Sequence, residues 1–138
     1  MAEVKWVEGM KFTAVSDSGS KFIFDTTSET IEAEAGSFKP MEMLLLSLAG
    51  CTAMDTVSIL VKMREQLKEF KITVDGTRRG EHPKIFTNIT LHYHLKGVNL
   101  DEDKVKKAIN LSQEKYCSVS AMLKQSAEVK FTYEIENI

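Results

Sequence analysis

The chain has 138 residues, of which 43% are hydrophobic and 28% are charged, an ordinary balance for one globular domain. A formal net charge of −2 gives no general attraction to nucleic acid or to acidic membranes. Residues 1–138 are therefore predicted to form a single domain that binds neither nucleic acid nor a membrane. The first residues, Met-Ala-Glu-Val-Lys-Trp, lack a basic segment followed by an apolar stretch. We therefore expect no signal peptide and predict a cytoplasmic protein.

The first quarter of the chain is predicted to form short β-strands. The run from Val4 to Val15 is rich in strand formers, and the turn-forming segment Ser16 to Gly19 separates it from a second run, Lys21 to Asp25. The two runs are predicted to pair as a hairpin. A third short strand is predicted around Glu29 to Ala33.

A long helix is predicted to begin at Pro40 and to continue to about Leu67. Proline suits the first helical position because its missing N–H would have no partner there. The segment from Met41 to Met54 is apolar nearly all round, which predicts burial on most sides. It is too short, and too interrupted by acidic residues, to span a bilayer of roughly 30 Å. Because a small domain has difficulty covering such a helix alone, we predict a homodimer.

Two strands are predicted to follow the long helix. Apolar and polar residues alternate from Phe70 to Asp75, and they alternate again after a turn at Gly80 to Pro83. The predicted inward face of the second strand consists of Ile85, Ile89, Leu91, Tyr93 and Leu95. Its predicted outward face consists of Asn88, Thr90, His92, His94 and Lys96.

Helices and one more strand are predicted to complete the chain. Asn99 to Glu102 matches a capping box. The helix that it opens has a predicted buried stripe of Val105, Ala108, Ile109, Ser112 and Tyr116. A short helix from Cys117 to about Lys124 precedes a strand whose inward residues are predicted to be Ala127, Val129, Phe131, Tyr133 and Ile135. The order β-β-β-α-β-β-α-α-β predicts an α+β fold with helices on an antiparallel or mixed sheet.

The two cysteines are the strongest chemical candidates. Cys51 lies in the apolar part of the long helix, and Cys117 lies at the predicted start of the short helix, where the helix dipole favours a thiolate. In a compartment that keeps thiols reduced, two cysteines are either inert thiols or a transient redox pair. Two cysteines without further ligands at suitable spacing are a poor zinc site. Free cysteine is usually a small buried hydrophobe. A reactive Cys51 requires a positively charged partner, which its local sequence does not supply.

The other polar candidates have simpler interpretations. His92 and His94 share one strand face and could share a metal, but the sequence shows no third ligand, so a solvated strand face is the preferred interpretation. Arg78 and Arg79 end a strand and could bind an anion or pair with a catalytic group, although exposed charge is the default. His82, before Pro83, is expected at the surface.

Three segments together resemble one protein family. Residues 39–60 contain Leu-Ala-Gly-Cys-Thr-Ala-Met-Asp, residues 81–89 read Glu-His-Pro-Lys-Ile-Phe-Thr-Asn-Ile, and residues 111–119 read Leu-Ser-Gln-Glu-Lys-Tyr-Cys-Ser-Val. In this order they resemble the first-cysteine helix, the following strand and the second-cysteine segment of the OsmC/Ohr family, in particular its OsmC-like subgroup. These are the osmotically inducible and organic hydroperoxide resistance proteins.

The resemblance implies an OsmC-like fold, with antiparallel or mixed sheets packed on a long central helix. It also implies an intertwined homodimer with active sites at the subunit interface. Cys51 would then attack an organic hydroperoxide and become a sulfenic acid, and Cys117 would form a disulfide with it. In the family a dithiol reductant of the lipoyl type restores both thiols, and no bound cofactor is needed.

Two positions depart from the peroxidase members that the chain resembles. Those proteins place a glutamate directly after the helix-opening proline, where this chain has Met41; Glu42 comes one position later, about 100° around the helix. They also carry an arginine in the N-terminal strand region, whereas this chain has no arginine before Arg64. Glu42, Arg78 and Arg79 are therefore the candidate supporting residues.

A second hypothesis remains open from the sequence. In it the protein is a non-catalytic dimer that binds a small hydrophobic ligand at the subunit interface, and Cys51 and Cys117 are packing residues. Thiol reactivity that is lost in Cys51→Ser favours the peroxidase. Inert thiols and a ligand that co-purifies with the dimer favour the binding protein.

Overall fold

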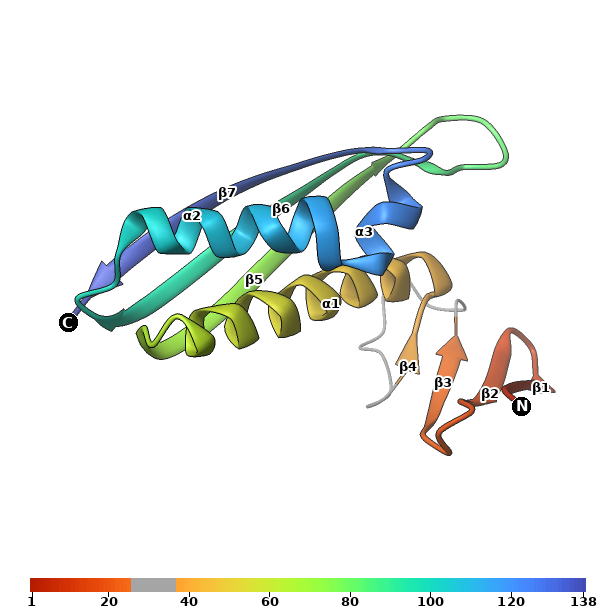
Figure 1. Ribbon diagram of the computed structural model, residues 1–138. Helices are drawn as coiled ribbons and strands as arrows, with labels where there is room; N and C mark the ends of the chain where they lie inside the picture. The colour runs from red at the N-terminus through yellow and green to blue at the C-terminus, as the bar shows by residue number, and fades with distance from the viewer. Residues whose placement is uncertain (26–36) are drawn as a thin grey trace. The chain divides into compact units, whose positions relative to one another are not determined.

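The computed structural model describes residues 1–25 and 37–138 (Figure 1). They form two compact units, Met1–Leu44 and Leu45–Ile138, and each is described by itself. The strand predicted around Glu29 to Ala33 lies outside the described residues. The single domain remains a prediction.

The N-terminal unit is a four-stranded sheet in chain order. Its strands are β1 (Glu3–Glu8), β2 (Lys11–Val15), β3 (Lys21–Asp25) and the two-residue β4 (Ser37–Phe38). The β2–β3 hairpin is confirmed, with Thr13 opposite Ile23. The single run predicted from Val4 to Val15 is wrong, because the chain turns at Gly9, whose φ of 48° suits a residue without a Cβ. Two antiparallel strands, β1 and β2, result.

The long helix α1 (Pro40–Lys62) begins where it was predicted but ends earlier. Arg64 adopts a φ of 62°, and its N–H donates to the carbonyl of Val61 at 3.0 Å. The N–H of Glu65 donates to the carbonyl of Leu60 at 3.0 Å, which completes a Schellman motif. Glycine is the usual residue at this left-handed position, so the arginine gave no stop signal, and the predicted end near Leu67 is wrong.

In the part of the chain that the structure describes, one stripe of α1 is buried. Its buried residues, Leu48, Thr52, Thr56 and Leu60, are spaced by one helical turn. Other apolar side chains of the helix stay exposed: Leu44, Leu46, Met54 and Val61. The 23-residue helix extends beyond the apolar run Met41 to Met54, and by length and composition alone it could cross a membrane, a criterion that the core helix of a soluble protein also meets.

The C-terminal unit is built on a mixed three-stranded sheet. The order is β5 (Gln66–Arg78), β6 (Phe86–Val98) and β7 (Glu128–Asn137), with β6 antiparallel to β5 and parallel to β7. The alternation predicted along β6 is confirmed from residue 88 to residue 96, because Ile89, Leu91, Tyr93 and Leu95 are buried. Ile85 is 37% exposed, contrary to prediction. A register shift between Thr77 and Arg78 buries Phe86 instead.

The helices of this unit lie on one face of the sheet. They are α2 (Glu102–Leu111), the π-helical turn η1 (Ser112–Tyr116) and α3 (Ser118–Leu123), on the same side as α1 (Figure 1). The cap of α2 is Asp101, whose side chain accepts from the N–H of Asp103 at 2.9 Å, so the capping box predicted at Asn99 is wrong. Val105, Ala108, Ile109 and Ser112 are buried as predicted, whereas Tyr116 is 50% exposed. The α+β class and the mixed sheet are confirmed.

Candidate functional site

The fold brings Cys51 and Cys117 together. Cys51 lies in α1, and Cys117 lies between η1 and α3. Their sulfur atoms and a carboxylate oxygen of Asp55 all lie within 4.8 Å of one another. Both thiols are free. Cys51 is partly exposed, whereas Cys117 is only 3% exposed.

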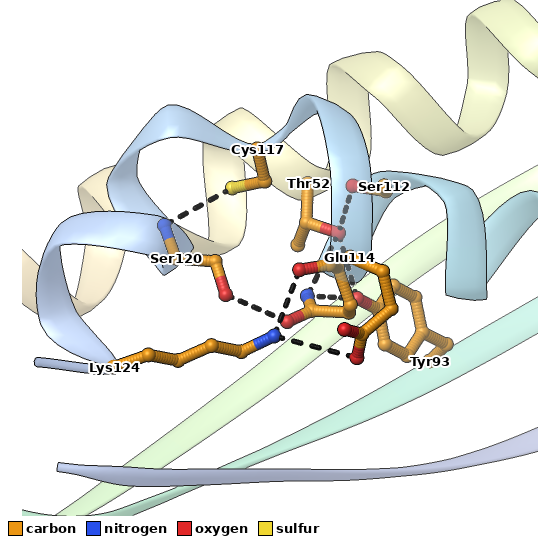
Figure 2. Close-up of polar contacts among 8 residues, drawn as sticks. Thr52, Tyr93, Ser112, Glu114, Cys117, Ser120 and Lys124 are labelled. Atoms are coloured by element: carbon orange, nitrogen blue, oxygen red, sulfur yellow. Dashed lines mark hydrogen bonds and ion pairs between the residues drawn. The ribbon is translucent and has the colours of Figure 1, made fainter.

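The π-helical turn determines where the Cys117 thiol lies. The backbone N–H of Cys117 donates to the carbonyl of Ser112 at 2.7 Å, a bond that spans five residues and widens the helix. Cys117 then adopts extended backbone angles and caps α3, with its sulfur accepting from the N–H of Ser120 at 3.4 Å. The cysteine itself is therefore the N-cap of α3. Figure 2 shows this sulfur pointing toward Ser120.

Cys117 is held as a protonated thiol. Burial is the main cause that raises its pKa to about 11, and the hydrogen bond from the N–H of Ser120 opposes the shift. A hydrogen bond to Cys51 and the charge of Asp55 raise the pKa further. At Cys117 desolvation therefore outweighs the helix N-terminus, a position that can make a thiol more acidic.

A cluster of buried polar side chains lies beside the thiols. We define the hydroxyl cluster as Thr52, Tyr93, Ser112, Gln113 and Ser120 (Figure 2). Thr52 Oγ1 lies 2.7 Å from both the Tyr93 hydroxyl and Ser112 Oγ. Gln113 Nε2 donates to the Tyr93 hydroxyl at 2.9 Å and to Thr52 Oγ1 at 3.2 Å. The cluster joins α1, β6, η1 and α3 across the core.

The proton positions in this cluster follow from the neighbouring Asp55 carboxylate. Ser112 Oγ donates to Asp55 Oδ2 at 3.0 Å, which uses its only proton. Ser112 therefore accepts from Thr52, and Thr52 accepts from the Tyr93 hydroxyl. The hydroxyl donors form a directed chain that ends on the Asp55 carboxylate. Burial is the main cause that raises the pKa of Tyr93, so this tyrosine stays a donor.

The other end of the hydroxyl cluster reaches Cys117. Ser120 Oγ donates to Gln113 Oε1 at 2.8 Å, while the N–H of the same serine donates to the Cys117 sulfur. Lys124 Nζ donates to the backbone carbonyl of Gln113 at 2.8 Å. It also pairs with Glu114 at 3.6 Å, as Figure 2 shows. The hydroxyl cluster therefore contacts the thiol site at two points: Ser112 bonds to Asp55, and Ser120 bonds to Cys117.

The predicted supporting residues occupy other places. Glu42 is exposed in the first turn of α1. Arg78 Nε donates to the Lys84 carbonyl at 2.7 Å. Arg79 Nε donates to the Pro83 carbonyl at 2.6 Å, so both arginines hold the turn between β5 and β6. In the part of the chain that the structure describes, the charges that shift the pKa of Cys117 belong to Cys51 and Asp55, with no arginine among them.

Only part of the hydroxyl cluster could be predicted from local sequence patterns. Ser112 and Tyr93 fall on predicted inward faces, and a polar residue at such a position indicates a buried hydrogen bond. Thr52 follows Cys51 directly but carried no separate signal. With Asp55 beside two thiols, the site also has three possible ligands for a metal ion such as zinc, one more than the cysteine pair alone suggested.

Known proteins resemble this chain along nearly its whole length. Residues 33–132 match the family described as OsmC-like protein. Protein YhfA of Escherichia coli K12 is 41% identical over 134 residues, which cover 97% of this chain and 96% of that protein. The crystal structure of a hypothetical protein from Aquifex aeolicus VF5 is 31% identical with a TM-score of 0.86, covering 100% of this chain and 96% of that one. The organic hydroperoxide resistance protein OhrB of Bacillus subtilis shares the fold, with 18% identity and a TM-score of 0.64 over 97% of this chain and 98% of that one.

Proposed function

Because this chain belongs to the OsmC-like protein family, we propose that it is a thiol-dependent peroxidase that reduces organic hydroperoxides. The observation that supports this most strongly is the convergence of the Cys51 and Cys117 sulfur atoms to within 4.8 Å. A protein of the same fold is named an organic hydroperoxide resistance protein, which is consistent with the proposed substrate.

The environments of the two thiols support a division of roles. Cys51 is partly exposed and is the thiol that a hydroperoxide can reach. Cys117 is buried, and its pKa of about 11 keeps it protonated at neutral pH. Its S–H can therefore donate a hydrogen bond to the Cys51 sulfur. We assign attack to Cys51 and resolution to Cys117.

The proposed reaction has three balanced steps. The Cys51 thiolate takes the distal oxygen of the hydroperoxide, the O–O bond breaks, and the alkoxide leaves as an alcohol after it gains a proton. The resulting sulfenic acid condenses with the Cys117 thiol, which forms a disulfide and releases water. A dithiol of the lipoyl type then reduces the disulfide by exchange and becomes a disulfide itself.

We further propose that the protein works as a homodimer. The exposed apolar side chains of α1, Leu44, Leu46, Met54 and Val61, present hydrophobic surface along one helix. An apolar patch of this kind is typical of an interface between proteins. A second copy is the simplest partner for it, as in the intertwined dimer that the family resemblance implies.

Steady-state turnover tests the proposed function. We expect the protein with a dihydrolipoyl reductant to reduce a tertiary alkyl hydroperoxide faster than hydrogen peroxide, because Cys51 lies within the apolar segment of α1. Cys51→Ser should lose this turnover entirely. Cys117→Ser should lose turnover with the dithiol while it still consumes one equivalent of hydroperoxide. Turnover that persists in Cys51→Ser contradicts the proposal.

A further inference from the structure

We propose that His92, His94 and Glu134 form a second, separate site that binds a divalent transition-metal ion of the zinc class. The three residues lie on the sheet face opposite to the one that α1 and α2 cover. The inference is independent of the peroxidase proposal, because none of these residues takes part in the thiol site.

Strand geometry places the two histidines side by side. Residues two apart on a strand point to the same face, and β6 is the central strand of its sheet. The His92 and His94 rings lie 4.3 Å apart between centroids. Their side chains are 31% and 29% exposed, so neighbouring strands shield the imidazoles while one side stays accessible. Two imidazole ligands are therefore already positioned before any metal arrives.

The parallel register supplies the third ligand, which no local pattern in the sequence reveals. Glu134 on β7 lies directly opposite His94, and Thr132 lies opposite His92. One oxygen of Glu134 contacts His94 Nδ1, and the other lies 3.8 Å from His92 Nε2. One nitrogen from each histidine and one Glu134 oxygen all lie within 4.8 Å of one another. The solvated strand face preferred from the sequence thus contains a complete set of three ligands.

Small side-chain rotations would bring these atoms to coordination distance. Zinc–nitrogen bonds of about 2.0–2.1 Å and zinc–oxygen bonds of about 2.0–2.2 Å place tetrahedral ligand atoms roughly 3.3–3.5 Å apart. Thr132 Oγ1 contacts His92 Nδ1, which leaves His92 Nε2 to face the metal. A hydrogen bond to the second ring nitrogen is the usual way in which a metal-binding histidine is oriented. Two histidines and one glutamate would leave a fourth position open to water.

The charges around the cluster favour a cation. In the groove on this face, the charges of Glu69 and Glu136 balance those of Lys71 and Lys96, so the carboxylate of Glu134 leaves the groove with one net negative charge. Lys96 pairs with Glu69 at 3.7 Å and with Glu136 at 3.6 Å. Among the described residues, the ion pairs of Glu134 are with His92 and His94 only. Its carboxylate is therefore available to a metal without the loss of a lysine salt bridge.

Metal titration of the full chain tests this site. We would use tag-free protein with Cys51→Ser and Cys117→Ser, so that the thiols cannot bind metal, and measure Zn²⁺ affinity against a chromophoric chelator. We expect one Zn²⁺ per chain. His94→Ala and Glu134→Gln should each weaken binding by about ten-fold or more, since even outer-shell changes cost that much. With Co²⁺ as the probe, the visible d–d bands should report a four-coordinate ion.

The third histidine of the chain provides the matched control. His82 is exposed in the turn between β5 and β6, so His82→Ala should leave the Zn²⁺ affinity unchanged. A solvated histidine–glutamate pair without metal affinity would show no saturable binding, and that result overturns the proposal. Binding that survives both His94→Ala and Glu134→Gln, or that is lost in His82→Ala, overturns it as well. Far-UV circular dichroism of each variant checks that the sheet remains folded.

Discussion

The Cys117 sulfur lies within 4.8 Å of both the Cys51 sulfur and the Asp55 carboxylate, so one thiol meets its proposed redox partner and a negative charge together. The carboxylate opposes a thiolate at Cys117, and the buried position opposes it more. The site thus contains one accessible thiol and one that is kept protonated. This asymmetry supports the assignment of Cys51 as the attacking residue.

Replacement of Asp55 by asparagine should make Cys117 more acidic. The change removes the charge that raises the pKa of Cys117, while the amide oxygen can still accept from Ser112 Oγ. We expect the pKa to fall by less than about one unit, because burial remains the main cause of the shift. Thiolate absorbance during a pH titration of Cys51→Ser protein measures this. Asp75→Asn, on an exposed position of β5, is the control, and an equal shift in both variants contradicts the assignment.

Two threonines one turn apart on α1 offer a matched pair of isosteric substitutions. Thr52→Val should destabilise the protein by about 1–3 kcal/mol, because it leaves Ser112, Tyr93 and Gln113 short of a partner. Thr56 Oγ1 is buried without a hydrogen-bond partner among the described residues, so Thr56→Val should be neutral or stabilising by up to about 1 kcal/mol. Urea unfolding of the two variants compares them directly. Equal losses in both would show that the hydroxyl cluster contributes no stability.

The shifted pKa of Cys117 predicts how stability depends on pH. The native state holds this proton up to a pKa of about 11, against 9.0 for an ordinary cysteine, so the native state binds more protons between these values. The contribution of Cys117 to the free energy of unfolding is therefore complete below about pH 9 and is lost as the pH rises to 11. The difference between the wild type and Cys117→Ala, measured by urea unfolding across this range, isolates the effect from other groups. A difference that is constant with pH contradicts the prediction.

The substitution Gly50→Ala can distinguish a solvent-exposed surface of α1 from a dimer interface. A Cβ built at this exposed position meets nothing within 4 Å in the described part of the chain. In an isolated chain, Gly50→Ala should therefore stabilise α1 by about 1 kcal/mol through helix propensity. If the partner subunit packs closely here, as we propose, the same substitution should weaken the dimer. Sedimentation at several protein concentrations measures the dimer dissociation constant. A dimer that is tighter in Gly50→Ala would show that Gly50 does not lie at the interface.

Local patterns predicted the strands and the main helix but not every boundary. The period-two alternation of β6 and the proline at the start of α1 are local signals, and both predictions are confirmed. The end of α1 depends on the left-handed conformation of Arg64, and arginine is not a residue type that predicts this conformation. The cap of α2 lies at Asp101 and not at Asn99, because Asn99 has a φ of 49° whereas Asp101 has the extended backbone typical of an N-cap residue.

The sites depended on contacts between distant residues, which explains what the sequence could not predict. Thr52 bonds to Ser112 across the core, and Glu134 meets His94 only through the register of two parallel strands. Neither spacing forms a local motif. The pairing of Cys51 with Cys117 could still be predicted, because the family resemblance links two segments that share no local motif.

Thiol counting after one equivalent of a tertiary alkyl hydroperoxide tests the central claim most directly. We predict that the wild type loses two thiols per chain and that peptide mapping finds an intramolecular Cys51–Cys117 disulfide. Cys117→Ser should accumulate a sulfenic acid at Cys51 that dimedone traps, while Cys51→Ser should keep its single thiol. Two intact thiols in the treated wild type, or equally fast oxidation of Cys51→Ser, would contradict a Cys51–Cys117 redox pair.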